Sequence, residues 1–254
     1  MLTDVAVIVT TCCRPSLVRA IESIFHQDHK KLIHILIGVD KELFGNFSEI
    51  YQDFEKRRPD NILLTVINPG YSTSSRHNGI HSCIFGGSLK TALTFLASSR
   101  YVTYLDDDDW YESSHLRLLR SAIEGNSWAF SLCNYADSDR GVILGPDEIE
   151  SVGPGQGIYN DNFGGFVRPS ALMMDKLRLA SIMHLWSESA FPNREGEDRL
   201  IFNALLPFND FGQTGIPTVN YSLDPNDPLH PTRLNFLISK GINIQPVIKT
   251  DSVR

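Results

Sequence analysis

Four consecutive aspartates follow a short apolar run in the first half of the chain. The run YVTYL occupies residues 101–105, and the residues at 106–109 all carry carboxylates. Two ionised carboxylates about 5 Å apart repel each other by roughly 3 kcal/mol at an effective dielectric constant near 20, so the cluster requires compensation. A divalent cation, a basic side chain or the water around an exposed turn could provide it.

The residues before the acids indicate that the cluster lies in a binding crevice. Residues 101–105 are aliphatic, aromatic or β-branched, which is typical of a buried strand. Sheets of α/β proteins bind their ligands just beyond the carboxyl ends of such strands. This position favours a ligand or cation over a solvated turn, although a solvated face is the usual role of a run of like charges.

Alternating strand and helix patterns precede the acidic cluster. Strands are expected at 5–9, 32–40 and 62–67, and amphipathic helices at 16–27 and 47–57. This β-α-β-α-β order predicts an α/β fold of the Rossmann-like type, with a mostly parallel central sheet and helices on both faces.

The rest of the chain has a less regular pattern. Segment 68–79 is rich in Gly, Pro, Ser and Asn and predicts a loop, and 135–165 predicts loops and short hairpins. The other expected elements are helices at 88–99, 113–124, 170–179 and 197–206, and strands at 128–134 and 218–222. Because no internal repeat and no clean linker divides the sequence, a single domain is the simplest account.

Composition limits the classes of function. The 254 residues, 42% of them hydrophobic, are enough for a substantial core, and 23 basic against 30 acidic residues argue against a nucleic-acid partner. The cysteines at 12, 13, 83 and 133 form no C-x-x-C pair, so we expect reduced thiols. Asp4 does not suit a secretion signal, and no apolar run approaches the roughly 20 residues of a transmembrane segment. We therefore expect a cytoplasmic protein, with peripheral membrane contact left open.

Several short motifs, taken in chain order, resemble those of the family 2 glycosyltransferases of the GT-A fold. The motifs are RPSLVRAIESIFHQ, SRHNGI, LDDDDW, GEDRL and YSLDPNDPLHP, and the similarity covers about residues 4–238. The resemblance implies one GT-A domain at 1–240, with a nucleotide-sugar-binding half at 1–110 and an acceptor half at 111–240. Residues 241–254 match nothing and are expected to form a C-terminal extension.

The activity implied by the resemblance is that of an inverting hexosyltransferase. Such an enzyme moves a sugar from a nucleotide-diphosphate donor, most often a UDP-sugar, to a hydroxyl of a saccharide or lipid-linked acceptor in polysaccharide or glycoconjugate synthesis. A bound Mn²⁺ or Mg²⁺ stabilises the leaving diphosphate as a Lewis acid. The family pattern puts Asp108 on the metal, Asp107 or Asp106 toward the ribose, and His230 near the metal or diphosphate. A lone histidine is more often structural, so both roles remain open for His230.

A set of donor-binding residues is also implied by the resemblance. The set consists of Thr10, Thr11, Cys12, Arg14, Asp40, Arg76, Asp106 and Asp107. Asp40 would accept a hydrogen bond from the base, but it could equally be a cap or turn acid. Arg76 would approach the base or the diphosphate, and its alternative is a surface ion pair. Cys12 and Cys13 depart from the family, which usually has tyrosine and asparagine after the first strand.

The general base is expected in the GEDRL motif. Asp198 matches the position of the family base, which takes the proton from the acceptor hydroxyl. Glu197 could serve instead, because adjacent helical residues point about 100° apart and only one of them faces the sugar. Alternatively, both acids only favour the positive N-terminal end of the helix that follows.

Three rival functions fit parts of the pattern. A phosphotransferase of the haloacid-dehalogenase type would carry its acids after the first strand, and a nucleotidyltransferase would have a glycine-rich basic loop there, whereas TTCCRPS has no glycine. A non-catalytic sugar- or nucleotide-binding protein could retain the fold. The presence of both Asp108 and Asp198 favours the transferase.

Overall fold

Buried strands form the centre of the fold. β1 (Thr3–Thr11), β2 (Ile33–Val39), β3 (Ile62–Ile67) and β4 (Ser99–Asp106) pair in parallel in the order β3-β2-β1-β4. All seven residues of β2 are buried, as expected for a strand that is covered on both faces. The carboxyl ends of β1, β2 and β4 therefore meet at one edge of the sheet.

The computed structural model describes residues 2–81, 83–137 and 139–242. Most of the extension expected at 241–254 thus lies outside the described residues. Among the helices of the described part, none is long and apolar enough to cross a bilayer.

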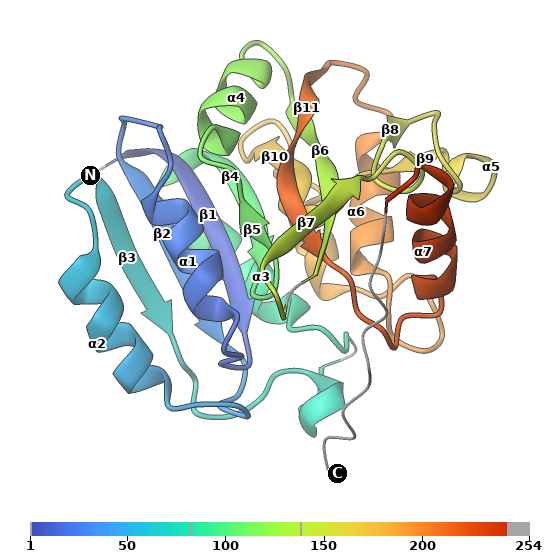
Figure 1. The fold of residues 1–254 in the computed structure, drawn as a ribbon. Helices are drawn as coiled ribbons and strands as arrows, with labels where there is room; N and C mark the ends of the chain where they lie inside the picture. The colour runs from blue at the N-terminus through green and yellow to red at the C-terminus, as the bar shows by residue number, and fades with distance from the viewer. Residues whose placement is uncertain (1, 82, 138, 243–254) are drawn as a thin grey trace.

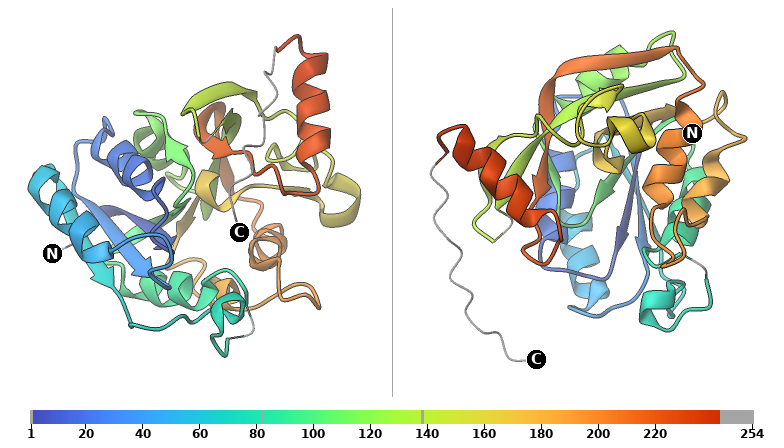
Figure 2. Two further views of the ribbon diagram at one scale, coloured as in Figure 1. Left: turned by 60° about the horizontal axis from the view of Figure 1, so that its bottom comes forward. Right: turned by 90° about the vertical axis from the view of Figure 1, so that its right-hand side faces the viewer.

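Helices cover both faces of the parallel strands. α1 (Leu17–Phe25) and α2 (Phe47–Arg57) lie on one face, and α3 (Gly87–Leu96) lies on the other (Figures 1 and 2). α1 forms because its apolar residues recur at helical spacing and bury one side, and α2 begins at Asn46, whose side chain accepts a hydrogen bond from the backbone N–H of Ser48. The elements expected up to residue 67 are confirmed to within two residues.

The second half of the sheet is mixed. β10 (Leu172–Asp175) pairs antiparallel with β4 and with β6 (Trp128–Asp137), β11 (Phe211–Ser222) runs parallel to β6, and β5 (Trp110–Tyr111) and β7 (Val142–Pro146) complete the sheet as antiparallel strands. The α/β class is confirmed. The strands from β3 to β4 in the sheet are all parallel, as expected, whereas the remaining strands pair in both parallel and antiparallel directions.

Shorter elements surround this second half. They are α4 (His115–Ala122), α5 (Asn160–Phe163), α6 (Glu197–Leu205), α7 (His230–Ser239), the 3₁₀ turns η1 (Ser75–His77), η2 (Pro169–Ala171) and η3 (Met183–Ser187), and the strands β8 (Gly153–Pro154) and β9 (Gly165–Phe166). β8 and β9 pair with each other in a separate two-stranded sheet, which agrees with the short hairpins expected between 135 and 165.

The prediction of a helix at 170–179 is wrong. This segment instead contains η2 and β10, and all four residues of β10 are buried. Leu and Met favour helices by intrinsic propensity, but a short apolar run carries no clear period, and here two neighbouring strands satisfy its backbone on both sides. The helix expected at 88–99 ends at Leu96, because β4 already begins at Ser99.

Gly87 allows α3 to approach η3 closely, and a Gly87→Ala substitution should lower the free energy of unfolding by about 1 to 3 kcal/mol. A Cβ atom at this position would lie 1.9 Å from the carbonyl oxygen of Trp186. Urea denaturation measures the effect. Ser88→Ala in the same turn is the control and should change stability by less than about 0.5 kcal/mol. An unchanged unfolding midpoint for Gly87→Ala would contradict this close contact.

Candidate active site

The four aspartates at the end of β4 differ in their exposure to solvent. Asp107 and Asp109 are buried, whereas the side chains of Asp106 and Asp108 are 37% and 40% exposed. All four line one pocket of about 540 Å³. Two acids are thus partly exposed to the pocket, and two are buried.

Asp107 joins the end of β4 to the end of β1. The Thr11 hydroxyl donates to Asp107 at 2.6 Å, and Arg14 Nη1 lies 2.9 Å from both Asp107 and Asp108. One guanidinium therefore serves two carboxylates. This sharing leaves negative charge at the pocket floor that the protein does not fully offset.

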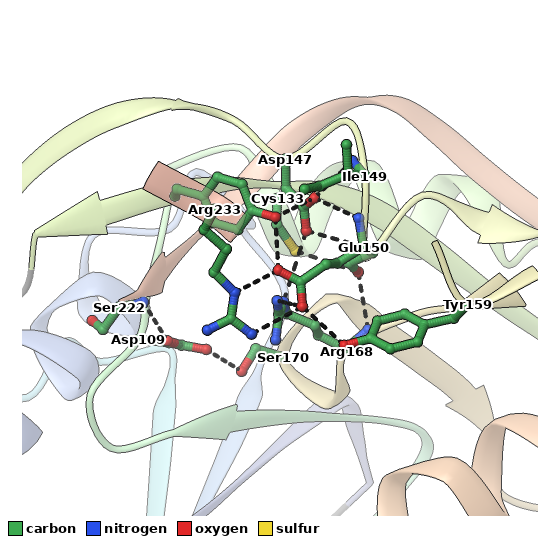
Figure 3. Close-up of polar contacts among 12 residues, drawn as sticks. Asp109, Cys133, Asp147, Ile149, Glu150, Tyr159, Arg168, Ser170, Ser222 and Arg233 are labelled. Atoms are coloured by element: carbon green, nitrogen blue, oxygen red, sulfur yellow. Dashed lines mark hydrogen bonds and ion pairs between the residues drawn. The ribbon is translucent and has the colours of Figure 1, made fainter. Parts of the chain in front are cut away.

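Asp109 connects two more parts of the sheet (Figure 3). Its carboxylate accepts a hydrogen bond from the Ser170 hydroxyl at 2.8 Å and one from the backbone N–H of Ser222 at 3.0 Å. Ser170 belongs to η2, and Ser222 ends β11. Asp109 thus has a structural role, since its oxygens hold together the strands around the pocket.

Burial and mutual repulsion act on the whole cluster. Partial burial, followed by repulsion from Asp107 and Asp106, raises the pKa of Asp108 to about 6. Burial likewise raises the pKa of Asp109 well above its usual range. Both shifts have the sign expected for carboxylates that are withdrawn from water and repelled by neighbouring carboxylates. Oxygen donors in this electrostatic state suit a hard divalent cation.

Lys90 is a site residue that the sequence reasoning missed. It lies in α3, is buried, and places its Nζ 3.2 Å from Asp106. Burial lowers the pKa of Lys90, but the charges of Asp106 and Glu197 raise it by more, so this lysine stays charged. The signal was available in the pattern, because Lys90 falls on the apolar side of its helix together with Leu93. A buried lysine needs carboxylate partners.

Glu197 and Asp198 begin α6 and face the same pocket. Gly196 precedes them with φ of 87°, a left-handed conformation that glycine adopts readily. Glu197 is buried, and burial raises its pKa to about 7 although Lys90 opposes the rise. Asp198 is more exposed than Glu197. The geometry thus brings both predicted base candidates to the pocket that holds the aspartate cluster.

Asp40, at the end of β2, organises the loop expected at 68–79. Its carboxylate accepts hydrogen bonds from the Ser72 hydroxyl at 2.7 Å, the Thr73 backbone at 2.8 Å and hydroxyl at 2.9 Å, and the Ser74 backbone at 3.3 Å. This arrangement matches the alternative in which Asp40 is a turn acid. It also fixes the loop that carries Arg76 into the pocket.

The remaining donor residues predicted from sequence line the same pocket. They are Thr10, Thr11, Cys12, Arg14 and Arg76. Cys12 Sγ lies 3.7 Å from His77 Nε2, and one donor atom from each of Cys12, Asp40 and His77 falls within 4.8 Å of the others. Because the Asp40 oxygens already accept four hydrogen bonds, we interpret these three residues as a wall of the pocket rather than a metal centre.

His230 is the one predicted site residue that does not line the pocket. It begins α7, directly after Leu229, which does line it. Its Nδ1 is buried and has no hydrogen-bond partner among the described residues. Burial and the nearby charge of Arg233 lower the pKa of His230, so the ring is neutral at pH 7 and Nδ1 or Nε2 can act as an acceptor.

A buried ion cluster forms another wall of the pocket (Figure 3). Glu150 accepts hydrogen bonds from Arg233 at 2.5 and 2.9 Å and from the Tyr135 hydroxyl at 2.8 Å, and Arg168 lies 3.0 Å away. Burial raises the pKa of Glu150, but the guanidinium groups of Arg168 and Arg233 outweigh this effect and lower the pKa to about 2. No sequence pattern indicates this cluster, because its members are distant in the chain and only the fold brings them together.

Comparisons with known proteins identify the fold. No family model and no curated protein sequence matches the chain. The solved structure of S. aureus TarS is similar with a TM-score of 0.59 and 16% identity, over 95% of this chain and 40% of that one. TarS 1–349 in complex with UDP-GlcNAc has a TM-score of 0.60 and 12% identity, over 95% of this chain and 68% of that one. The complex of TarS 1–349 with UDP has a TM-score of 0.58 and 15% identity, over 95% of this chain and 67% of that one. The chain therefore has a glycosyltransferase fold of the GT-A type.

Glu150→Gln should lower the free energy of unfolding by roughly 3 kcal/mol at pH 7, because it leaves Arg168 and Arg233 buried without their carboxylate. The folded pKa of Glu150, about 2, lies below the ordinary value of 4.5. Its stabilisation is therefore complete above pH 4.5 and is lost as the pH falls toward 2, so the difference between variant and wild type should shrink over that window.

Urea denaturation at pH 7 and pH 3 measures this difference. Glu148→Gln is the matched control, since Glu148 is half-exposed and pairs with Lys240 at the surface. Its substitution should cost less than about 1 kcal/mol. Equal stability losses in the two variants at pH 7 would refute the assigned role of Glu150.

Proposed function

We propose that the chain is a metal-dependent, inverting glycosyltransferase of family 2. It would transfer a sugar from a nucleotide-diphosphate donor, a UDP-sugar, to a hydroxyl of a saccharide or lipid-linked acceptor. The observation that carries this proposal is that the aspartates after β4 and the acids that begin α6 line one pocket. The likeness to TarS, whose structures hold UDP and UDP-GlcNAc, supports this class of donor.

The exposure of the aspartates supports particular roles for two of them. Asp108 would hold Mn²⁺ or Mg²⁺, because it is accessible, rich in negative charge and offers only oxygen donors. Asp106 would accept from the ribose, since Asp107 is already engaged by Thr11 and Arg14. The role expected for His230, a contact with the metal or the diphosphate, has no such support, because His230 does not line the pocket. When bound, the cation stabilises the negative charge that develops on the leaving diphosphate.

The donor nucleotide would occupy the carboxyl ends of β1 and β2. Thr10, Thr11 and Cys12 line this part of the pocket, and the loop fixed by Asp40 presents Arg76. A guanidinium there suits the diphosphate, which it can bind through charge-assisted hydrogen bonds.

Asp198 is the proposed general base. It is more accessible than Glu197. Glu197 is buried near Lys90 and is therefore better suited to offsetting the charge of that lysine. Asp198 would take the proton of the acceptor hydroxyl while the acceptor oxygen forms its bond to the anomeric carbon. The bond from that carbon to the diphosphate breaks on the opposite side, so the configuration inverts.

Asp198→Asn should retain UDP affinity within about two-fold and lower the turnover number by about 10²- to 10⁴-fold, because the hydroxyl loses its proton acceptor. Release of UDP from a panel of UDP-sugars, with and without saccharide acceptors, measures turnover. Glu197→Gln is the matched control and should have the smaller effect. If Glu197→Gln abolishes transfer and Asp198→Asn does not, the base is Glu197. If wild type binds UDP without any transfer, the chain is a binding protein.

Asp108→Ala should abolish the metal dependence of nucleotide binding. In wild type we expect UDP to bind at least about ten-fold more tightly with Mn²⁺ than with EDTA, and in the variant the two affinities should become equal. Isothermal titration calorimetry provides the measurement. Asp224→Ala, which removes another pocket-lining acid outside the cluster, should keep the dependence. A metal dependence that persists in Asp108→Ala excludes this residue as the ligand.

A further inference from the structure

Most basic side chains of the pocket have a carboxylate partner. Arg14 and Lys90 pair with the aspartates that follow β4, and Arg168 pairs with Glu150. Arg199 lines the same pocket, yet it takes part in none of the ion pairs found among the described residues. This arginine therefore has no direct carboxylate partner within the described part of the chain.

Aromatic rings hold Arg199 in position. Its Cζ lies 3.5 Å from the ring centre of Phe166 and 3.9 Å from that of Tyr159. Its Nη1 is buried and has no hydrogen-bond partner in the described part of the chain. Ring faces attract a cation and restrict its movement, but they do not neutralise its charge. The guanidinium is thus held by the rings and by a hydrogen bond with the Tyr159 side chain, and its charge has no direct carboxylate partner among the described residues.

The buried ion cluster of Figure 3 orients one of these rings, that of Tyr159. The Tyr159 hydroxyl donates to Glu150 at 3.1 Å, and Glu150 is in turn held by Arg168 and Arg233. Phe166 is buried in β9. The position of Arg199 is therefore set before any ligand arrives, and this pre-organisation lowers the entropy cost of binding.

Arg199 lies on the side of the pocket where the acceptor would bind. It directly follows the proposed base Asp198 in α6, and both residues line the pocket. α5 and β9, next to which Arg199 lies, are on the opposite side of the molecule from β1 and β2, whose ends carry the proposed donor residues (Figure 1). Phe191, which is 38% exposed and also lines the pocket, adds an apolar surface that suits a sugar ring.

We propose that Arg199 binds an anionic group, a phosphate or a carboxylate, on the acceptor saccharide. A planar guanidinium forms two parallel charge-assisted hydrogen bonds with either group. Neutral hydroxyls alone would leave its charge without a counter-ion in a partly desolvated site. This inference rests on the proposed function, because it assigns the acceptor class to the same pocket.

The test compares charged and neutral probes on the full chain loaded with UDP and Mg²⁺. The probes are glucose 6-phosphate, glucuronic acid and the neutral methyl β-glucoside, with binding followed by NMR titration at constant ionic strength. At least one charged probe should bind about ten-fold or more tightly than the neutral one. The two charged probes also distinguish a phosphate from a carboxylate acceptor.

Arg199→Gln should remove this preference and leave the weaker affinity for the neutral probe within about two-fold, since only the charge-assisted bonds are lost. Arg199→Lys should restore part of the preference, because the charge returns without the planar fork. Inorganic phosphate should compete with the charged probe in wild type and not in Arg199→Gln. UDP affinity, measured in parallel, should be unchanged in both variants and reports on correct folding.

Three outcomes would overturn the inference: equal binding of charged and neutral probes by wild type, a preference that survives in Arg199→Gln, or no binding of either charged probe. Failure of the proposed function is a separate result. The proposed function fails if wild type does not bind UDP in a metal-dependent way. The probe comparison is then repeated without nucleotide and judged by the same criteria.

Discussion

Compensation of negative charge at the carboxyl end of β4 is the constraint on which the site depends. Asp107 and Asp109 are each neutralised or hydrogen-bonded by groups from other strands, so the bonds that satisfy them also hold β1 and β11 against β4. The same bonds leave Asp106 and Asp108 accessible. Local stability and the accessible negative charge of the pocket thus have one origin, because four acidic residues stand together at the end of a strand and only two of them are buried.

Lys90 extends this charge balance across the pocket. Its ammonium group lies 3.2 Å from the Asp106 carboxylate, and the negative charge of Glu197 also stabilises the charged form of this lysine. One buried cation therefore links the proposed donor side to the start of α6. Any change in the charge of Glu197 is expected to be felt at Asp106, so the proposed donor and base regions are electrostatically coupled although they belong to distant parts of the chain.

Sequence reasoning succeeded where a pattern has a strong period and failed where tertiary pairing decides. The bounds of α2 match the expectation because its apolar residues recur at helical spacing after the cap Asn46, and those of β3 match because polar residues flank a short apolar run. β10 was missed because Leu172, Met173 and Met174 favour helices by propensity, whereas in the fold two neighbouring strands pair with them. The pocket was predictable, since strand ends meet at one edge of a sheet. Which aspartates are buried was not, because that depends on Thr11 and Ser170, which are remote in sequence.

The separate β8–β9 hairpin gives the two sides of the pocket different freedom to change. Its strands are not part of the ladder of the central sheet, so insertions or replacements there leave the register of β4 and β6 intact. The end of β4 has no such latitude, because each acid is tied to its neighbours. Under the proposed function, replacements between residues 153 and 166 would alter the choice of acceptor and leave the donor site unchanged, so directed evolution aimed at new products would begin there.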